Sequence, residues 1–362
     1  MGFGRSDPVV AGYAVCQGAR VVTMQADRRG QSGVPRGLAI LGTGRALPVR
    51  AVAAAALDRQ YGLADGYVMA ATGVATRYFC DGESQIDLAV DAARKALVDA
   101  QLTAADIDLV ISAAAVAYQP IPAMAPAIQR ALGIADGACF AVDLNCTCLG
   151  FAAALHFAEP LLQAGRHKTI LIVSAEVASR GLPWATQPAV AGLFGDGAGA
   201  AVVALRPDVG IRAAHFVTLT SAYEACAIGA GGTRFDFERE AEAFAAHSKF
   251  AMDGKALFRI TAKHFGPFVD VLLDRAATRR DDLACVIAHQ ASPGALAHMI
   301  QICGFRSDHV IDIAGQFGNQ IAASIPFALD WARAAGRFRS GDRILILGTS
   351  AGVSFGGLVM DV

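Results

Sequence analysis

The chain has 362 residues, of which 54% are hydrophobic and 17% are charged, and its formal net charge is −1. This balance predicts a large core and gives no electrostatic reason to bind nucleic acid or an anionic membrane surface. Eight scattered cysteines, no apolar run long enough to cross a bilayer and no secretion-type leader predict a cytoplasmic protein without a membrane segment.

The first ordered elements are expected after an N-terminal extension. Residues 1–36 are rich in Arg, Gly and Ser and predict a segment without a packed core of its own. The short apolar run Gly37–Gly42 predicts a buried strand that is closed by a glycine turn. Helical periodicity follows at Asp87–Ala100, and the apolar run Leu109–Ala115 predicts the next strand.

The segment Cys139–Leu162 combines a strand, a turn and a buried helix. The apolar run Cys139–Leu144 ends in a turn of small residues that carries Cys148, and the helix that follows is apolar on almost every face. Backbone N–H groups at a helix start favour a thiolate, so Cys148 is a candidate nucleophile. The alternative is that Cys148 is a small buried hydrophobe, as most cysteines are. Cys146 and Cys148 form a Cys-x-Cys without a second ligand pair, which predicts no metal site.

The remaining elements continue the alternation of strands and helices. The run Thr169–Ser174 predicts a strand, and the small-residue run Gly195–Val203 follows a loop. Residues Arg234–Lys249 are charged, contain phenylalanine and predict a partly exposed helix.

The second half of the chain repeats the first in the same order. Five pairs match: Val110-Ile111 with Val286-Ile287, Ile128-Gln129 and Gly133 with Ile300-Gln301 and Gly304, Val142–Leu144 with Ile311–Ile313, Ile170–Val173 with Ile344–Leu347, and Ala198-Gly199 with Ala351-Gly352. This repetition predicts two homologous α/β halves, residues 37–207 and 208–362, which form five layers if their buried helices pack back to back.

The repeat draws attention to two further polar residues. Asn319 lies in the strand-to-helix turn that corresponds to the turn of Cys148, and His289 ends the strand Ala284–Ala288. Each has an ordinary structural explanation, since a strand-end histidine is commonly satisfied by neighbours and a Gly-Asn pair is commonly a turn. Their placement at equivalent elements favours a shared pocket with Cys148. The other seven histidines have no such placement and are interpreted as structural or surface residues.

On these residues the chain resembles the β-ketoacyl-(acyl-carrier-protein) synthase III family of the thiolase superfamily, from about Gly37 to the C-terminus. The motifs that carry the resemblance are Thr72-Gly73-Val74 with Arg77, Asp143–Phe151, Leu193–Gly199, His289-Gln290-Ala291, Gly318-Asn319 continuing to Pro326, and Gly348–Gly356. The resemblance implies a duplicated, five-layered αβαβα thiolase-like fold. It also implies a homodimer with the loop Pro120–Pro126 near the subunit contact.

The resemblance also assigns chemistry to these residues. Cys148 would carry an acyl group as a thioester, and the backbone N–H groups of Cys148 and Ala351 would stabilise the oxyanion. His289 and Asn319 would donate to the thioester oxygen of a malonyl group as it loses carbon dioxide. The expected substrates are an acyl-CoA or acyl-ACP and a malonyl thioester, the expected partner is acyl carrier protein, and no metal or redox cofactor is required.

The expected entrance to the site departs from the family pattern. Tyr67 and Ala71 align with the Trp and Arg that hold adenine in relatives, and Ser292 replaces an Asn after His-Gln-Ala. Pro293-Gly294 stands where relatives have the arginine linked to carrier-protein docking, whereas Arg180 and Arg259 are expected to keep two basic contacts. These changes favour a dedicated or secondary-pathway synthase over the housekeeping initiator of fatty-acid synthesis.

Two other functions remain open from the sequence. An acyltransferase would pass the group on Cys148 to an alcohol or amine, but such a transfer generates no enolate for Asn319 to stabilise. A non-catalytic partner subunit of a heterodimeric synthase would not need the complete set of Cys148, His289 and Asn319.

Overall fold

The computed structural model describes residues 36–362, which belong to one compact unit, Pro35–Val362. The predicted extension, residues 1–36, lies outside the described residues except for Arg36, which begins the first strand. Among the described helices, none has the length and apolar character that crossing a membrane requires.

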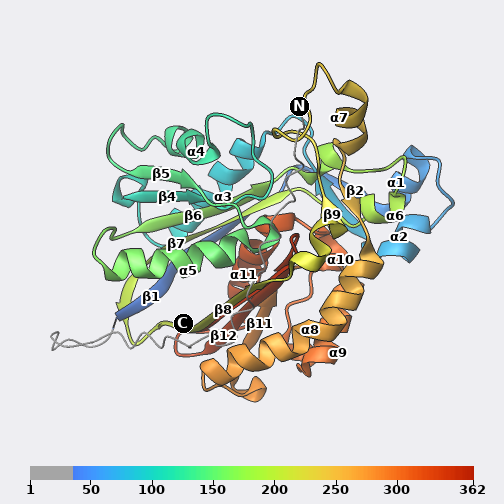
Figure 1. The fold of residues 1–362 in the computed structure, drawn as a ribbon. Helices are drawn as coiled ribbons and strands as arrows, with labels where there is room; N and C mark the ends of the chain where they lie inside the picture. The colour runs from blue at the N-terminus through green and yellow to red at the C-terminus, as the bar shows by residue number, and fades with distance from the viewer. Residues whose placement is uncertain (1–35) are drawn as a thin grey trace, which may run out of the picture. The chain divides into compact units, whose positions relative to one another are not determined.

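Two mixed sheets form the framework (Figure 1). The first has the order β1-β7-β6-β4-β5, with β1 (Arg36–Ala46), β7 (Gly197–Pro207), β6 (Ile170–Glu176), β4 (Leu109–Ser112) and β5 (Phe140–Asp143). The second has the order β11-β12-β13-β8, with β11 (Cys285–Ala288), β12 (Arg343–Ser350), β13 (Ser354–Asp361) and β8 (Gly210–Thr218). Two short ribbons pair β2 (Arg50–Ala53) with β3 (Thr76–Phe79) and β9 (Cys226–Ala227) with β10 (Ala251–Met252).

The two sheets have the same internal arrangement. β7 lies antiparallel between β1 and β6, and β13 lies antiparallel between β8 and β12. β4 and β11 occupy equivalent positions, each parallel to its neighbour, β6 or β12. Beyond β4 lies β5, and beyond β11 the segment at Val310 forms an isolated parallel bridge with Val286. The predicted duplication is therefore confirmed, and β8 is the counterpart of β1.

Helices separate and cover the sheets (Figure 1). α5 (Gly150–Gln163) and α11 (Ser324–Ala334) pack in the central core between the sheets. α3 (Gln85–Asp99) and α4 (Met124–Leu132) cover the outer face of the first sheet, and α8 (Gly254–Arg275) and α9 (Pro293–Cys303) cover that of the second. The shorter helices are α1 (Ala54–Gln60), α2 (Tyr67–Thr72), α6 (Pro188–Ala191), α7 (Ala241–His247) and α10 (Ala314–Phe317).

The alternation of side chains along the strands explains why both faces of each sheet are covered. In β4, Leu109 and Ile111 join the central core whereas Val110 packs toward α3 and α4. In β11, Ile287 joins the same central core and Val286 packs toward α8 and α9. Strands buried on both faces need apolar residues at every position, as the continuous runs in the sequence have. The layers are helices, sheet, helices, sheet and helices, in agreement with the predicted five-layered fold.

Glycines allow the central helices to approach the strands closely. A Cβ on Gly199 of β7 would lie 2.5 Å from the backbone nitrogen of Phe327 in α11. A Cβ on Gly150, the first residue of α5, would lie 2.5 Å from the carbonyl oxygen of Ala113 beyond β4. Both glycines therefore fix how near the helices come to the sheets, and Gly150 also fixes the helix that follows Cys148.

Three predicted elements differ in detail. β4 ends at Ser112 rather than at Ala115, because the backbone N–H of Ala115 turns to the carboxylate of Glu176. The predicted helix Arg234–Lys249 is helical only as α7, since Asp236 Oδ1 accepts from the N–H groups of Glu238 and Arg239 and holds a turn there. The structural counterpart of β7 is β13, whereas Ala351-Gly352 lies in the turn before that strand.

Candidate active site

One cavity brings the three predicted catalytic residues together. Its volume is about 910 Å³, and Cys148, His289 and Asn319 all line it. The end of β12 (residues 348–350) and the turn before β13 (residues 351–353) form another part of its wall. The cysteine comes from the segment before the central helix α5, and the other two side chains come from the second half of the chain.

A tight turn holds Cys148 at the start of α5. Cys148 lies in the 3-10 turn Thr147–Leu149, and the helix begins at Gly150. Thr147 has φ of 45°, which is rare for a β-branched residue. Asn145 supports this conformation, because its Oδ1 accepts from the backbone N–H of Thr147 at 2.9 Å. The turn therefore fixes the backbone on which the sulfur is carried.

Burial opposes the thiolate form of Cys148 in this structure. The pKa of the thiol is raised, chiefly by desolvation and then by the nearby Cys226 and Glu176. The backbone N–H groups of Cys148 and Ala351 interact with the sulfur and act in the opposite direction. The expectation that the helix start would favour a thiolate is thus only partly met, since the burial penalty exceeds the stabilisation by the N–H groups.

Asn319 is oriented by the backbone around it. Its Oδ1 accepts from the N–H of Ile321 at 2.8 Å, and the side chain is 7% exposed. No acceptor for its Nδ2 hydrogens is found among residues 36–362. Gly318, with φ of 71°, leaves no room for a Cβ, which would lie 2.9 Å from the carbonyl oxygen of Leu193. Asn319 is therefore held with its donor nitrogen free for a ligand.

The turns of Cys148 and Asn319 are structurally equivalent. In each, an asparagine Oδ1 accepts from the N–H two residues later, Asn145 from Thr147 and Asn319 from Ile321. Thr147 and Ile321 have φ of 45° and 51°, and a 3-10 turn leads from each into the central helix. The sequence reasoning missed Asn145, although its spacing to the helix start equals that of Asn319. One turn of the duplicated pair presents the thiol and the other presents the amide.

His289 is buried and held by Ser324 of α11. Its Nδ1 lies 2.6 Å from Ser324 Oγ, and the side chain is 7% exposed. The backbone N–H of Gln290 donates to the same Oγ at 3.3 Å. When Oγ donates its own proton to Nδ1, the ring proton lies on Nε2. Burial lowers the pKa of His289 to about 4, so the ring is neutral at physiological pH.

The buried histidine predicts a contribution to acid stability. Its pKa falls from 6.5 to about 4 on folding, so the unfolded chain binds the proton first as the pH falls. As the pH falls from 6.5 to 4, the free energy of unfolding of the wild-type protein should decrease by about 3 kcal/mol more than that of a His289→Asn variant. Urea unfolding of both proteins at pH 4.5 to 7.5 measures this difference. A constant difference across the range would contradict a neutral, buried His289.

A buried carboxyl group, that of Glu176, lies close to Cys148. Glu176, at the end of β6, accepts from the N–H groups of Ala115 at 2.5 Å and Val116 at 3.4 Å. Burial raises its pKa to about 8. The carboxyl group joins the segment after β4 to β6 beside the cavity. The sequence analysis missed it, and its signal is a single acidic residue that ends an otherwise apolar strand.

The predicted entrance residues do not all reach this cavity. Ser292 lines it and caps α9, where Ser292 Oγ accepts from the N–H of Ala295 at 3.0 Å. Tyr67 on α2, Arg180 in the turn Ala178–Gly181 and Arg259 on α8 are not among its lining residues. The structure therefore brings one of the four side chains to the cavity wall.

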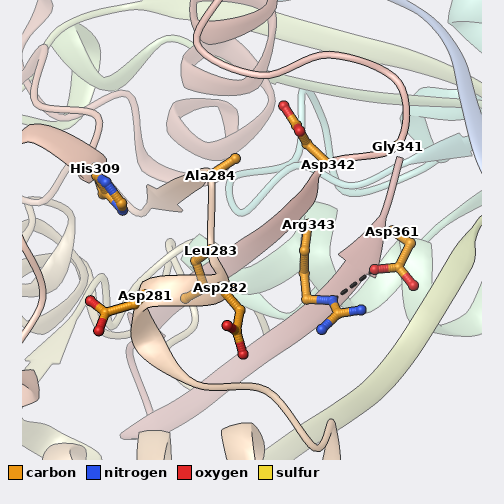
Figure 2. A pocket seen from close by; sticks show the side chains of 9 residues that line it. All are labelled: Asp281, Asp282, Leu283, Ala284, His309, Gly341, Asp342, Arg343 and Asp361. Atoms are coloured by element: carbon orange, nitrogen blue, oxygen red, sulfur yellow. Dashed lines mark hydrogen bonds and ion pairs between the residues drawn. The ribbon is translucent and has the colours of Figure 1, made fainter.

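A second hollow, of about 520 Å³, lies away from these residues (Figure 2). It surrounds the start of β12 at Arg343, whereas the catalytic cavity adjoins the end of the same strand. Figure 2 shows the ion pair between Arg343 and Asp361 at its wall, where Nε and Oδ1 are 2.7 Å apart. None of Cys148, His289 and Asn319 lines this hollow, so it is not the candidate site.

Comparisons with known proteins identify relatives of this chain. The family model described as 3-oxoacyl-[acyl-carrier-protein (ACP)] synthase III matches residues 142–220, and the model of its C-terminal part matches residues 273–362. The β-ketoacyl-[acyl-carrier-protein] synthase III 3 of Streptomyces coelicolor is 34% identical over 334 residues, which cover 89% of this chain and 96% of that protein.

Solved structures give the same result. The 3-oxoacyl-[acyl-carrier-protein] synthase III of Aquifex aeolicus superposes with a TM-score of 0.80 and 28% identity, covering 90% of this chain and 100% of that chain. The priming β-ketosynthase of the R1128 polyketide biosynthetic pathway has a TM-score of 0.81 and 26% identity, covering 92% of this chain and 98% of that chain. Both similarities extend over about nine tenths of this chain.

Proposed function

Since the chain belongs to the β-ketoacyl-[acyl-carrier-protein] synthase III family, we propose that it forms a β-ketoacyl thioester by decarboxylative Claisen condensation. The observation that carries this proposal is the common cavity of Cys148, His289 and Asn319. In this proposal the half 37–207 supplies the nucleophile, and the half 208–362 supplies the two donors that act on the second substrate.

The first step transfers an acyl group to Cys148. The sulfur attacks the thioester carbonyl, a new carbon–sulfur bond forms, and the bond to the carrier sulfur breaks. The carrier leaves as a thiol, because it takes the proton that Cys148 loses. The step therefore starts from the uncharged thiol, in keeping with the raised pKa of Cys148. The N–H groups of Cys148 and Ala351, which adjoin the sulfur, are placed to stabilise the oxyanion during the attack.

The second step generates a carbon nucleophile from a malonyl thioester. The bond to the carboxylate breaks, carbon dioxide leaves, and the electron pair moves into an enolate whose charge lies on the thioester oxygen. Nε2–H of His289 and the Nδ2 hydrogens of Asn319 donate to that oxygen. The enolate carbon then attacks the acyl carbonyl, and the Cys148 sulfur leaves as a thiolate that takes a proton from solvent. Neutral, fixed donors in a buried site suit this charge, because they need no reorganisation when it develops.

We propose acyl carrier protein as the donor of the malonyl group and an acyl-CoA or acyl-ACP as the donor of the first acyl group. The cavity wall near the reacting residues is largely apolar, which suits an acyl chain. The altered residues around Ser292 support a role in a dedicated or secondary pathway.

A homodimer is part of the proposal. β5 is an edge strand of the first sheet, and its Phe140 is 62% exposed. Ile121, in the loop before α4, is 87% exposed, and Pro126 of the predicted loop lies in the first turn of that helix. Apolar side chains on an edge strand and its neighbouring loop are suited to a subunit contact. We expect light scattering to give twice the mass of one chain, and Phe140→Asp to shift the protein toward monomer. A wild-type monomer at micromolar concentration would contradict this part of the proposal.

The overall proposal is tested by following each step separately. The protein is incubated with acyl-CoAs of increasing length, and its intact mass is measured for an adduct on Cys148. Malonyl-ACP is then added, and carbon dioxide and the β-ketoacyl product are measured. An adduct followed by both products is the expected result. An adduct that instead moves to an alcohol or amine without carbon dioxide would indicate an acyltransferase, and no adduct with any donor would indicate a non-catalytic subunit.

A further inference from the structure

The part of the cavity between α8 and α9 has a nearly continuous apolar wall. One face of each helix contributes, with residues three or four positions apart. These are Leu257, Thr261 and Phe265 on α8 and Leu296, Met299 and Ile302 on α9. Thr261 adds no open polar group, because its hydroxyl donates to the carbonyl oxygens of Leu257 and Phe258, each at 3.0 Å.

His298 on α9 is the exception in this wall. It lines the cavity, and its Nε2 is buried without a hydrogen-bond partner among residues 36–362. Its ring lies against Phe258 of α8, with the two ring centroids 4.4 Å apart. The contact with Phe258 fixes the imidazole plane, so Nε2 is held in a defined position and has no protein group to bind.

A buried polar atom without a partner is costly. Leaving one unsatisfied destabilises the folded protein, and native structures contain few. A ligand that passes along the α8–α9 wall and carries one hydrogen-bonding group between methylene groups would satisfy both the apolar wall and Nε2. A plain hydrocarbon chain would leave Nε2 unpaired, and a uniformly polar ligand would not match Leu296 and Met299.

We propose that His298 is a binding residue that hydrogen-bonds an amide, hydroxyl or oxo group set between methylenes of a linear thioester substrate. This rests on the proposed function for the nature of the ligand. Two parts of such a substrate have this chemistry: the amide-bearing arm of coenzyme A or carrier protein, and an acyl chain oxidised at one carbon. Phe258 is 55% exposed, so His298 lies toward the open end of the cavity. This position favours the arm, because the acyl group must lie at Cys148.

The test measures binding to the full-length protein with probes that separate these two sources. Free coenzyme A contains the arm without an acyl chain, and dodecanoate and 3-hydroxydodecanoate are chains without the arm. His298→Phe keeps an aromatic ring against Phe258 and removes the hydrogen bond, and His298→Gln restores a polar atom. His264→Phe is the matched control, since His264 is on α8 and does not line the cavity. Thermal unfolding of each variant checks the fold, and His298→Leu, which also removes the hydrogen bond, replaces His298→Phe if that variant does not fold.

We expect His298→Phe to weaken coenzyme A by about 5- to 100-fold, His298→Gln to recover part of the loss, and His264→Phe to change nothing. Dodecanoate should bind all variants equally. If only 3-hydroxydodecanoate weakens, the partner of His298 is the acyl chain instead of the arm. Unchanged affinity for all probes in a His298→Phe protein that still forms the Cys148 adduct overturns the inference and leaves the proposed function intact. If the wild-type protein forms no Cys148 adduct with any acyl-CoA, the proposed function and this inference are refuted together.

Discussion

Replacing Cys148 with alanine is expected to abolish the acyl adduct and to lower condensation by a factor on the order of 10⁵. The reason is that Cys148 supplies the sulfur beside the two N–H groups of Cys148 and Ala351. The measurements are intact mass after incubation with acyl-CoA, and release of the β-ketoacyl product in the presence of malonyl-ACP. Decarboxylation of malonyl-ACP without condensation can persist in this variant, because His289 and Asn319 are unchanged.

A second cysteine in the same cavity provides the matched control. Cys226 also lines the cavity, and its proximity raises the pKa of Cys148. Cys226→Ala should keep the adduct, and it should lower the pH at which Cys148 reacts with a small alkylating reagent. Turnover by Cys148→Ala at the wild-type rate would show that the nucleophile has been misassigned, and loss of the adduct in Cys226→Ala alone would point to the other thiol.

Removing either enolate donor is expected to slow decarboxylation by about 10²–10³ while acylation continues. Asn319→Asp retains an oxygen for the N–H of Ile321, but it removes the Nδ2 donor and places a negative charge beside the developing enolate. His289→Ala removes the second donor. Carbon dioxide release from malonyl-ACP measures this step, and the adduct formed in the first seconds measures acylation. Because both donors act on one oxygen, the double variant should lose less than the product of the two single effects.

The duplicated turn supplies the control for Asn319→Asp. Asn145 makes the same bond to the N–H two residues later, but its Nδ2 donates to the carbonyl oxygen of Ala115. Asn145→Asp therefore makes the same chemical change in an equivalent turn without removing a donor from the cavity. We expect it to keep decarboxylation within a few-fold of wild type. Equal losses of decarboxylation in Asn319→Asp and Asn145→Asp would mean that Asn319 only stabilises its turn and donates no hydrogen bond to the enolate.

The sequence predicted the fold and the grouping of three residues because both follow from repetition. Equivalent strand ends in two related sheets must lie at comparable places, which brought His289 and Asn319 to the side of Cys148. Glu176 and Ser324 were missed for the opposite reason. Their partners, Ala115 and His289, lie far away in the chain, and no local pattern marks such contacts.

Electrostatics and the entrance were harder to predict than the catalytic set. A helix start is visible in the sequence, but the burial of Cys148 by elements from both halves is not, so the net direction of its pKa was missed. Tyr67, Arg180 and Arg259 were placed by alignment to relatives, and the structure does not bring them to the cavity lining. His298 had no signal in the sequence, because its unpaired Nε2 is defined only by the packing of α9 against α8.

The shared cavity has a consequence for how an active molecule is made. Ala351, whose N–H adjoins the sulfur, lies in the turn before the final strand β13, and Asp330 of α11 binds back to Thr43 and Arg45 of the first strand. A nascent chain therefore cannot perform the chemistry until the segment that contains Ala351 has left the ribosome. Prematurely terminated products that lack Ala351 should therefore be inert toward cellular thioesters. Contacts so distant in the chain form slowly, so the time at which a refolding protein begins to form the Cys148 adduct measures when folding is complete.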